Sequence, residues 1–149
     1  IYKNIKWPED PLFYVCCPSK TDSMVAPDGQ ENLFLLIPIA PGLEDSNLIR
    51  DVYFNKVITR LEKYCETSIL DSIVVKRSYC INDFKTDYNS FKGNAYGLAN
   101  TLSQTANLKP SIKNKNLSNL FYTGQLTIPG PGVPPALISG QLVADYLLK

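Results

Sequence analysis

Short apolar runs separated by polar loops fill the first part of the chain and predict a pair of strands. Residues 12–17 are apolar and aromatic, and Pro18 ends the run. Residues 33–40 are nearly continuously apolar, which is typical of a buried strand, and Pro38 indicates an edge position or a bulge. The polar loop of residues 19–30 lies between the two runs. We therefore expect an antiparallel strand pair joined by a long loop.

The middle of the chain changes to helical spacing. One apolar stripe consists of Leu48, Val52, Val57, Ile58, Leu61, Tyr64 and Cys65. Asp45, Ser46 or Asn47 can cap the start of this helix. Residues 69–79 then alternate between apolar and polar side chains, which predicts a strand, and its connection through the helix predicts a crossover. Residues 81–100 are less regular, although Asp83–Phe84 and Tyr88–Asn89 can each start a short helix, and residues 103–118 are polar and rich in turns.

Residues 119–149 read as a strand, a glycine-rich loop and a helix. Residues 120–123 are apolar, aromatic and β-branched, and Gly124 stops them. A loop of glycines and prolines follows, and apolar positions at helical spacing come after it. Pro134 or Pro135 suits the first helical turn, because a proline there loses no N–H group that the helix needs.

A glycine-rich loop before a helix has a physical use. Glycines let the backbone approach a ligand closely. The helix start offers free N–H groups and the positive end of the helix dipole, which attract phosphate or a ring that gains negative charge on reduction. A connecting loop without a ligand is the alternative that the pattern leaves open, because a short glycine motif is a weak signal.

Composition argues against a disordered, nucleic-acid-binding or membrane-spanning chain. The 149 residues suit one compact domain or part of a larger one, and 44% hydrophobic with 19% charged residues argues against disorder. Fifteen basic and fourteen acidic residues leave a net charge of +1, so no electrostatic case exists for nucleic acid. No apolar run approaches the length that spans a bilayer.

The chain has four cysteines and no histidine, which removes several mechanisms. Without histidine or a Cys-x-x-Cys pair, a metal site is not expected, and a Ser-His-Asp or Cys-His arrangement cannot form within the chain. We interpret the cysteines as reduced thiols of a cytoplasmic protein. Chemistry here must depend on a cofactor or on carboxylate, lysine, tyrosine or cysteine groups.

The C-terminal stretch Thr123–Gly140 closely resembles the flavin-binding signature of bacterial phytoene desaturases, the carotenoid desaturase branch of the flavin amine oxidase superfamily. The resemblance continues upstream in the same order along nearly the whole chain. Its further blocks are Pro11–Val15, Pro18–Asp22, Ala26–Gly29, Glu31–Phe34, Asp83–Phe84, Tyr88–Asn89, Gly93–Leu98 and Gln104.

The resemblance implies an α+β (α/β) fold in two parts. Residues 1–118 would belong to a substrate-binding domain, an antiparallel or mixed sheet with packed helices. Residues 119–149 would be the C-terminal strand, loop and helix of an FAD/NAD(P)-binding Rossmann-like domain. Family members also carry a Gly-x-Gly-x-x-Gly loop that holds the ADP part of FAD, and no such sequence occurs here. We therefore expect the C-terminal portion of a desaturase, inactive by itself and retaining little or no FAD.

The resemblance also assigns roles to residues. The cofactor-binding positions that it implies are Gly124, Gln125, Pro129, Gly130, Gly132, Val133 and Pro134. Many members have a histidine before the Pro-Gly of this loop, where this chain has Ile128. The departure removes a role for an imidazole at the flavin but leaves flavin binding through backbone groups.

The implied reaction removes two hydrogens from a long polyene, with a hydride passing to FAD. Asp22 is a candidate proton acceptor, and the alternative is an aspartate that forms a turn in its own loop. Asp83 is a weaker candidate, with helix capping as the alternative. The aromatic residues that can line a path for the polyene, or else pack in the core, are Phe13, Tyr14, Phe34, Phe84 and Tyr96.

Two other interpretations remain. One is a related flavin amine oxidase or a retinol-saturase-like enzyme. The other is a non-catalytic module that binds lipid or a partner protein. Because a polyene is insoluble in water, we expect the full enzyme to touch a membrane surface peripherally.

Overall fold

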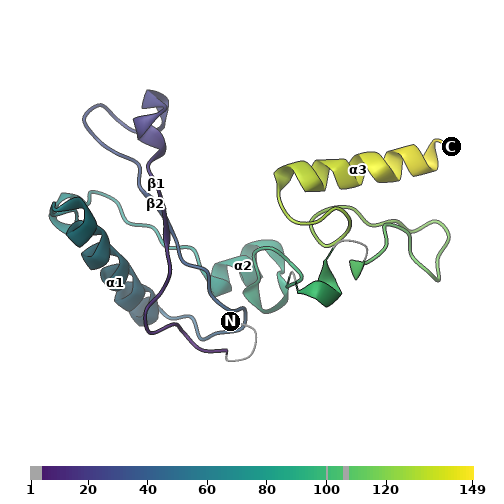
Figure 1. Ribbon diagram of the computed structural model, residues 1–149, viewed down its shortest axis with the longest axis horizontal. Coiled ribbons are helices and arrows are strands. Elements are labelled where there is room, and N and C mark those ends of the chain that lie inside the picture. The colour runs from purple at the N-terminus through teal and green to yellow at the C-terminus, as the bar shows by residue number, and fades with distance from the viewer. Residues whose placement is uncertain (1–4, 100, 106–107) are drawn as a thin grey trace. The chain divides into compact units, whose positions relative to one another are not determined.

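The computed structural model describes residues 5–99, 101–105 and 108–149, and it divides into two compact units, Ile1–Phe84 and Lys85–Lys149 (Figure 1). The strands and α-helices of the described residues are β1 (Tyr14–Cys16), β2 (Phe34–Leu36), α1 (Asn47–Cys65), α2 (Ile81–Tyr88) and α3 (Val133–Leu147). In general terms this is the predicted α+β class. The Rossmann-like assignment and the assignment of residues 1–118 to a substrate domain stay predictions.

The predicted antiparallel strand pair is confirmed, although it is short. In the two-stranded sheet Tyr14 lies opposite Leu36, and Cys16 lies opposite Phe34. The second strand is not buried as predicted, because Phe34 is 51% exposed. In the connecting loop the Ser19 hydroxyl accepts the N–H of Asn32 at 2.9 Å. This bond closes the base of the loop.

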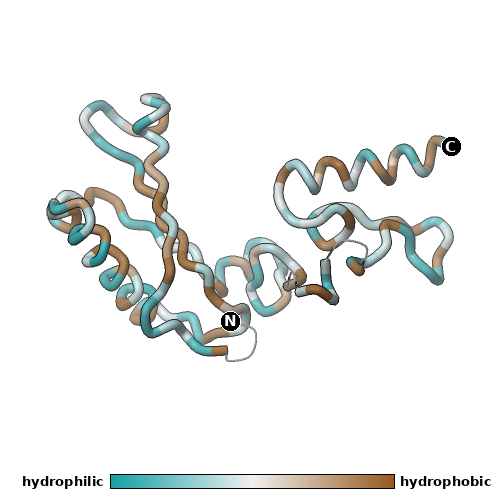
Figure 2. The backbone as a smooth tube through the Cα atoms, viewed as in Figure 1, coloured by the Kyte–Doolittle hydropathy of each residue, from teal (hydrophilic) through white to brown (hydrophobic). Residues whose placement is uncertain are grey.

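The predicted helix is confirmed as α1, with Ser46 as its cap. The Ser46 hydroxyl accepts the N–H of Ile49 at 3.3 Å, which satisfies one of the unpaired groups at the helix start. Hydrophobic and hydrophilic positions alternate around this helix (Figure 2). Its buried residues are Tyr53, Val57, Ile58 and Leu61. The remainder of the predicted stripe is exposed or half-buried, so the helix buries only its central face.

Two predicted strands are wrong. Residues 70–72 form a single 3-10 turn, and residues 73–80, among the described residues, form no strand and include a bend at Val74. The predicted crossover is therefore absent there as well. Alternating side chains do not suffice for a strand, because its N–H and C=O groups also need a neighbouring backbone.

The second wrong strand is residues 120–123. Phe121 makes an isolated bridge to Lys113, with Tyr122 N–H donating to Ile112 C=O at 2.8 Å. The segment is thus one side of a narrow loop. It precedes the glycine-rich segment, but it is not part of a described sheet.

A polar cluster beside a small core joins the helices of the first unit. The core consists of Ala40, Leu43 and Ile81, with Trp7, Ile39 and Cys80 packed against it. The fully buried carboxylate of Asp45 accepts from Arg50 Nε and Nη2, each at 2.6 Å, and from the N–H of Asn82 at 2.7 Å. Asp83 accepts the N–H of Cys80 at 2.7 Å and pairs with Arg50 at 2.8 Å. Asp83 therefore caps α2, which was the alternative to a catalytic role.

The four cysteines are free thiols. Burial raises the pKa of the Cys80 thiol above its ordinary value. Within the described part of the chain, no helix is both long and apolar enough to cross a membrane.

We expect Asp45→Ala to destabilise the first unit by about 3 kcal/mol, because the half-buried Arg50 guanidinium loses its main partner and keeps only Asp83. Urea denaturation followed by the fluorescence of Trp7, whose ring lies 4.4 Å from that of Tyr53, measures the change. Asp51→Ala is the control, since it removes only an exposed pair with Lys76 and should cost less than about 1 kcal/mol. Equal losses in the two variants would contradict a special role for Asp45.

Candidate functional site

A cleft of about 330 Å³ lies at the start of α3 in the second unit. Its lining residues are Tyr96, Gln125, Gly132, Val133 and Ala136. Three of the seven predicted cofactor positions, Gln125, Gly132 and Val133, therefore meet at one surface. Tyr96, predicted to line the substrate path, joins them from a distant part of the sequence. We take this cleft as the candidate site.

A buried hydroxyl on α3 holds the loop in place. Ser139 is fully buried, and its Oγ accepts the N–H of Gly124 at 2.7 Å and donates to the C=O of Ala136 at 2.6 Å. Thr127, also buried, donates from Oγ1 to the C=O of Gly124 at 2.9 Å. The turn that carries Gln125 is thereby fastened to the helix.

Sequence reasoning missed both hydroxyl residues. The signal available was the position of Ser139, which lies four residues before Val143 and shares the buried face of α3 with it. A small polar side chain on a buried helical face must find a hydrogen-bond partner. The sequence does not reveal that this partner is the N–H of Gly124.

The opposite wall of the cleft depends on Gly97. Its φ is +77°, and its N–H donates to the Asn94 side chain at 2.7 Å. A Cβ at this position would lie 2.1 Å from the Leu126 side chain. Glycine therefore suits both the positive φ and the close approach to Leu126, which packs the Tyr96 segment against the Gln125 turn.

The helix start offers fewer donors than expected. α3 begins at Val133 after Gly132, which has a φ of +113° and gives no side-chain cap, and Pro134 and Pro135 follow. Proline has no N–H, so among the first three helical positions only Val133 can donate. Within the described residues, neither this N–H nor the Gln125 side-chain amide has a hydrogen-bond partner.

The remaining cofactor positions do not line the cleft. Gly124 bonds to Ser139, and Pro129 and Pro134 are exposed. Gly130 is buried, with φ +139°, and the Cε of Lys109 lies 3.2 Å from where its Cβ would be. Lys109 is a third residue that sequence reasoning missed.

The other predicted site residues belong to the first unit. Asp22 is exposed and accepts the N–H of Met24 at 2.9 Å, so it forms the turn in its own loop. The ring of Phe13 lies under the Arg60 guanidinium at 5.0 Å. Phe84 packs edge-to-face on Tyr79 at 4.8 Å, and Tyr14 and Phe34 are exposed. None of these aromatic residues lies in the buried core.

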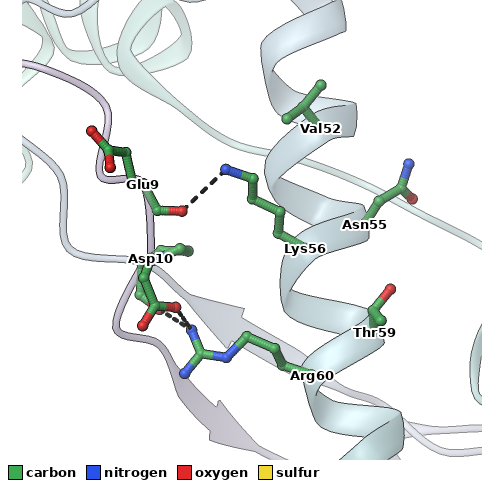
Figure 3. A pocket seen from close by; sticks show the side chains of 8 residues that line it. Glu9, Asp10, Val52, Asn55, Lys56, Thr59 and Arg60 are labelled. Atoms are coloured by element: carbon green, nitrogen blue, oxygen red, sulfur yellow. Dashed lines mark hydrogen bonds and ion pairs between the residues drawn. The ribbon is translucent and has the colours of Figure 1, made fainter.

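A larger pocket in the first unit, of about 600 Å³, lies between residues 9–11 and α1 (Figure 3). Both basic side chains that line this pocket bond to the protein itself. Lys56 donates to the Glu9 C=O at 3.1 Å, and Arg60 donates to the Asp10 carboxylate at 2.7 Å and to the Pro11 C=O at 2.6 Å. These bonds fasten the N-terminal segment to the helix. In the part of the chain that the structure describes, no cluster of three metal-binding side chains occurs.

Comparison with known proteins shows which proteins this chain is related to. No family model matches it. It is 45% identical over all 149 residues to a carotenoid 3,4-desaturase of Haloarcula japonica, and it covers 30% of that protein. The chain is homologous to one part of the carotenoid desaturases. The resemblance recognised in the sequence is confirmed, and these relatives are oxidoreductases.

Two further relatives agree. One is a zeta-carotene-forming phytoene desaturase of Myxococcus xanthus, 33% identical over 95% of this chain and 28% of the relative. The other is a 4,4'-diapophytoene desaturase of Staphylococcus haemolyticus, 32% identical over 97% of this chain and 30% of the relative. The chain thus spans about 30% of the length of the desaturases that it matches.

We expect Ser139→Ala to loosen the cleft, because the buried N–H of Gly124 loses its acceptor, at a cost of about 1–3 kcal/mol. Hydrogen exchange followed by mass spectrometry should show faster exchange in peptides that cover residues 122–130. Ser118→Ala, at an exposed position, is the control. Unchanged exchange in the Ser139 variant would mean that the turn does not depend on this bond.

Proposed function

We propose that this chain is the flavin-facing part of an FAD-dependent carotenoid desaturase, which removes two hydrogens from a long polyene. The observation that carries the proposal is 45% identity to a carotenoid desaturase along the whole chain. The meeting of Gln125, Gly132 and Val133 at one cleft supports it from the structure.

The donor set of the cleft suits a flavin ring better than a phosphate. A phosphate takes several backbone N–H groups at a helix start, and the prolines of α3 remove two of the first three. The N–H of Val133 and the amide of Gln125 suit single acceptors such as a ring carbonyl or ring nitrogen. Gly132, without a side chain, leaves room for the ring edge.

When bound, FAD supplies the acceptor for the hydride that leaves the polyene. The Val133 N–H would donate to the ring, and the positive end of the α3 dipole would favour added negative charge there. Gln125 would orient the ring through its amide group. The Ser139 and Gly97 contacts hold the two walls in position. Ile128 adds no imidazole, so the contacts come from the Val133 N–H and the Gln125 amide.

The proposed desaturase function also suggests which residues contact the polyene and where the full enzyme works. We propose that Tyr96 lines the polyene path beside the ring and that Asp22 accepts the proton. The water-insoluble polyene requires peripheral contact of the full enzyme with a membrane surface. The segment by itself would have negligible activity.

We expect Gln125→Leu, in the FAD-loaded enzyme that carries this segment, to weaken FAD binding about tenfold, the loss of one hydrogen bond of about 1.4 kcal/mol. Titration of the apoenzyme with FAD, followed by flavin fluorescence, measures the dissociation constant. Gln141→Leu is the matched control, because Gln141 lies on the exposed side of α3 and donates to Asp145. An enzyme that contains no flavin and converts no polyene would favour the non-catalytic binding module instead.

We expect Asp22→Asn to lower kcat by about a hundredfold if Asp22 accepts the proton, since general-base catalysis contributes about 10²–10⁴. Asparagine can still accept the N–H of Met24, so the turn is retained. Polyene conversion by the loaded enzyme, measured against pH, tests this. Full activity in the variant would limit Asp22 to its role in the turn.

A further inference from the structure

The two units of the chain differ in charge. The first unit has nine basic and twelve acidic residues, a net charge of −3, and the second has six lysines and two aspartates, a net charge of +4. The two aspartates of the second unit are Asp87 and Asp145, so residues 88–144 contain no carboxylate side chain. A stretch of lysines that no acidic residue interrupts attracts a negatively charged partner.

Two of these lysines, Lys113 and Lys115, lie in residues 112–122, which we call the basic loop. It is the narrow loop that stands out beside the C-terminal end of α3 in Figure 1. The N–H of Asn114 donates to the C=O of Leu120 at 3.0 Å, which closes the loop. At its tip the Asn114 side-chain oxygen accepts the N–H groups of Asn116 and Leu117 at 2.8 and 2.9 Å. The tip therefore has a defined conformation.

The base of the basic loop is attached to α3. The ring of Phe121 lies 5.5 Å from that of Tyr146, and Lys113 Nζ donates to the Tyr146 hydroxyl at 3.0 Å. The partner of Lys113 in this bond is a hydroxyl and not a carboxylate, so the bond leaves the positive charge of the loop unchanged. Asp145, the nearest carboxylate in the sequence, accepts from the Gln141 amide at 2.6 Å. The attachment holds the tip away from the helix.

The exposed side chains of the tip combine charge with apolar surface. Lys115 is exposed, and two residues further on the side chain of Leu117 is 54% exposed. A bilayer that contains anionic lipids accommodates both, because its phosphates attract the lysine and its acyl boundary takes up the leucine. A nucleic acid would attract the lysine but offers no apolar layer to the leucine. The second unit also contains no arginine, the residue best suited to bidentate binding of phosphates and bases.

We propose that the tip of the basic loop docks on a membrane surface that contains anionic phospholipids. This inference rests on the proposed function, in which the enzyme must reach a water-insoluble polyene. The lysines bring the second unit to the surface, and Leu117 enters the boundary between headgroups and acyl chains. Because a single loop buries little apolar area, the docking is weak and reversible.

The test is sedimentation of the enzyme that carries this segment with lipid vesicles. One set of vesicles contains phosphatidylcholine alone, and the other contains phosphatidylcholine and phosphatidylglycerol in equal parts. On the second set we expect Lys115→Gln to lower the partition coefficient about fivefold, the contribution of one lysine near an anionic surface. Leu117→Ser should lower it about threefold, because the apolar insertion is lost.

The controls are Lys63→Gln and Leu48→Ser, which make the same changes at exposed positions of α1 in the first unit. Both should leave the partition coefficient unchanged. Lys115→Arg keeps the charge and should keep the binding. Raising the salt concentration should weaken the binding of the unaltered enzyme and reduce the difference between it and Lys115→Gln, since salt screens exposed charges.

Two results would overturn the inference. One is vesicle binding that is the same in Lys115→Gln, Leu117→Ser and the controls, because docking would then use another surface. The other is binding of a single-stranded oligonucleotide that Lys115→Gln weakens, without binding to vesicles, which would assign the basic loop to nucleic acid.

Flavin content and the conversion of detergent-solubilised polyene separate this inference from the proposed function. Both should be unchanged in Lys115→Gln and Leu117→Ser, because detergent replaces the membrane. An enzyme that holds flavin and converts polyene, but whose vesicle binding ignores both substitutions, refutes the docking site alone. An enzyme that docks through the basic loop but holds no flavin and converts no polyene refutes the proposed function and leaves the docking site in place.

Discussion

The hydroxyl of Ser139 is the contact on which the candidate site depends. It lies between the N–H of Gly124 and the C=O of Ala136, and it is fully buried. A loop of glycines and prolines has little regular hydrogen bonding of its own, so this bond is the direct link between the Gln125 turn and the helix. The Ser139 hydroxyl, on the buried face of α3, thus fixes the conformation of a loop whose glycines would allow many others.

The prolines of α3 make that surface selective. They start the helix without a side-chain cap, and they also remove donors that a phosphate would need. What remains is one backbone N–H, one side-chain amide and the dipole of the helix. Together these features suit a flat ring whose charge changes during a reaction more than they suit a permanently charged group.

The first unit is held together by a buried carboxylate instead of a hydroxyl. Its apolar core is small. The buried carboxylate of Asp45 joins α1 to α2, because it accepts hydrogen bonds from Arg50 on α1 and Asn82 on α2. A buried ion pair costs desolvation, but its bidentate geometry and the added backbone N–H compensate for part of that cost. In this unit polar contacts therefore determine how the helices meet, while in the second unit a hydroxyl determines how a loop meets a helix.

Local signals in the sequence determined α1, α3 and the hairpin. Ser46 before an apolar stripe marked the start of α1, and the prolines after Gly132 marked the start of α3, because capping and the fixed φ of proline are properties of a few adjacent residues. The cleft was predictable only in part: Gln125, Gly132 and Val133 were identified by resemblance, whereas Ser139, Thr127 and Lys109 were not. The failed strands at 69–79 and 120–123 have the same cause. A strand, a buried hydroxyl and a buried ammonium group each need a partner far away in the sequence, and only the tertiary structure decides which partner lies within reach.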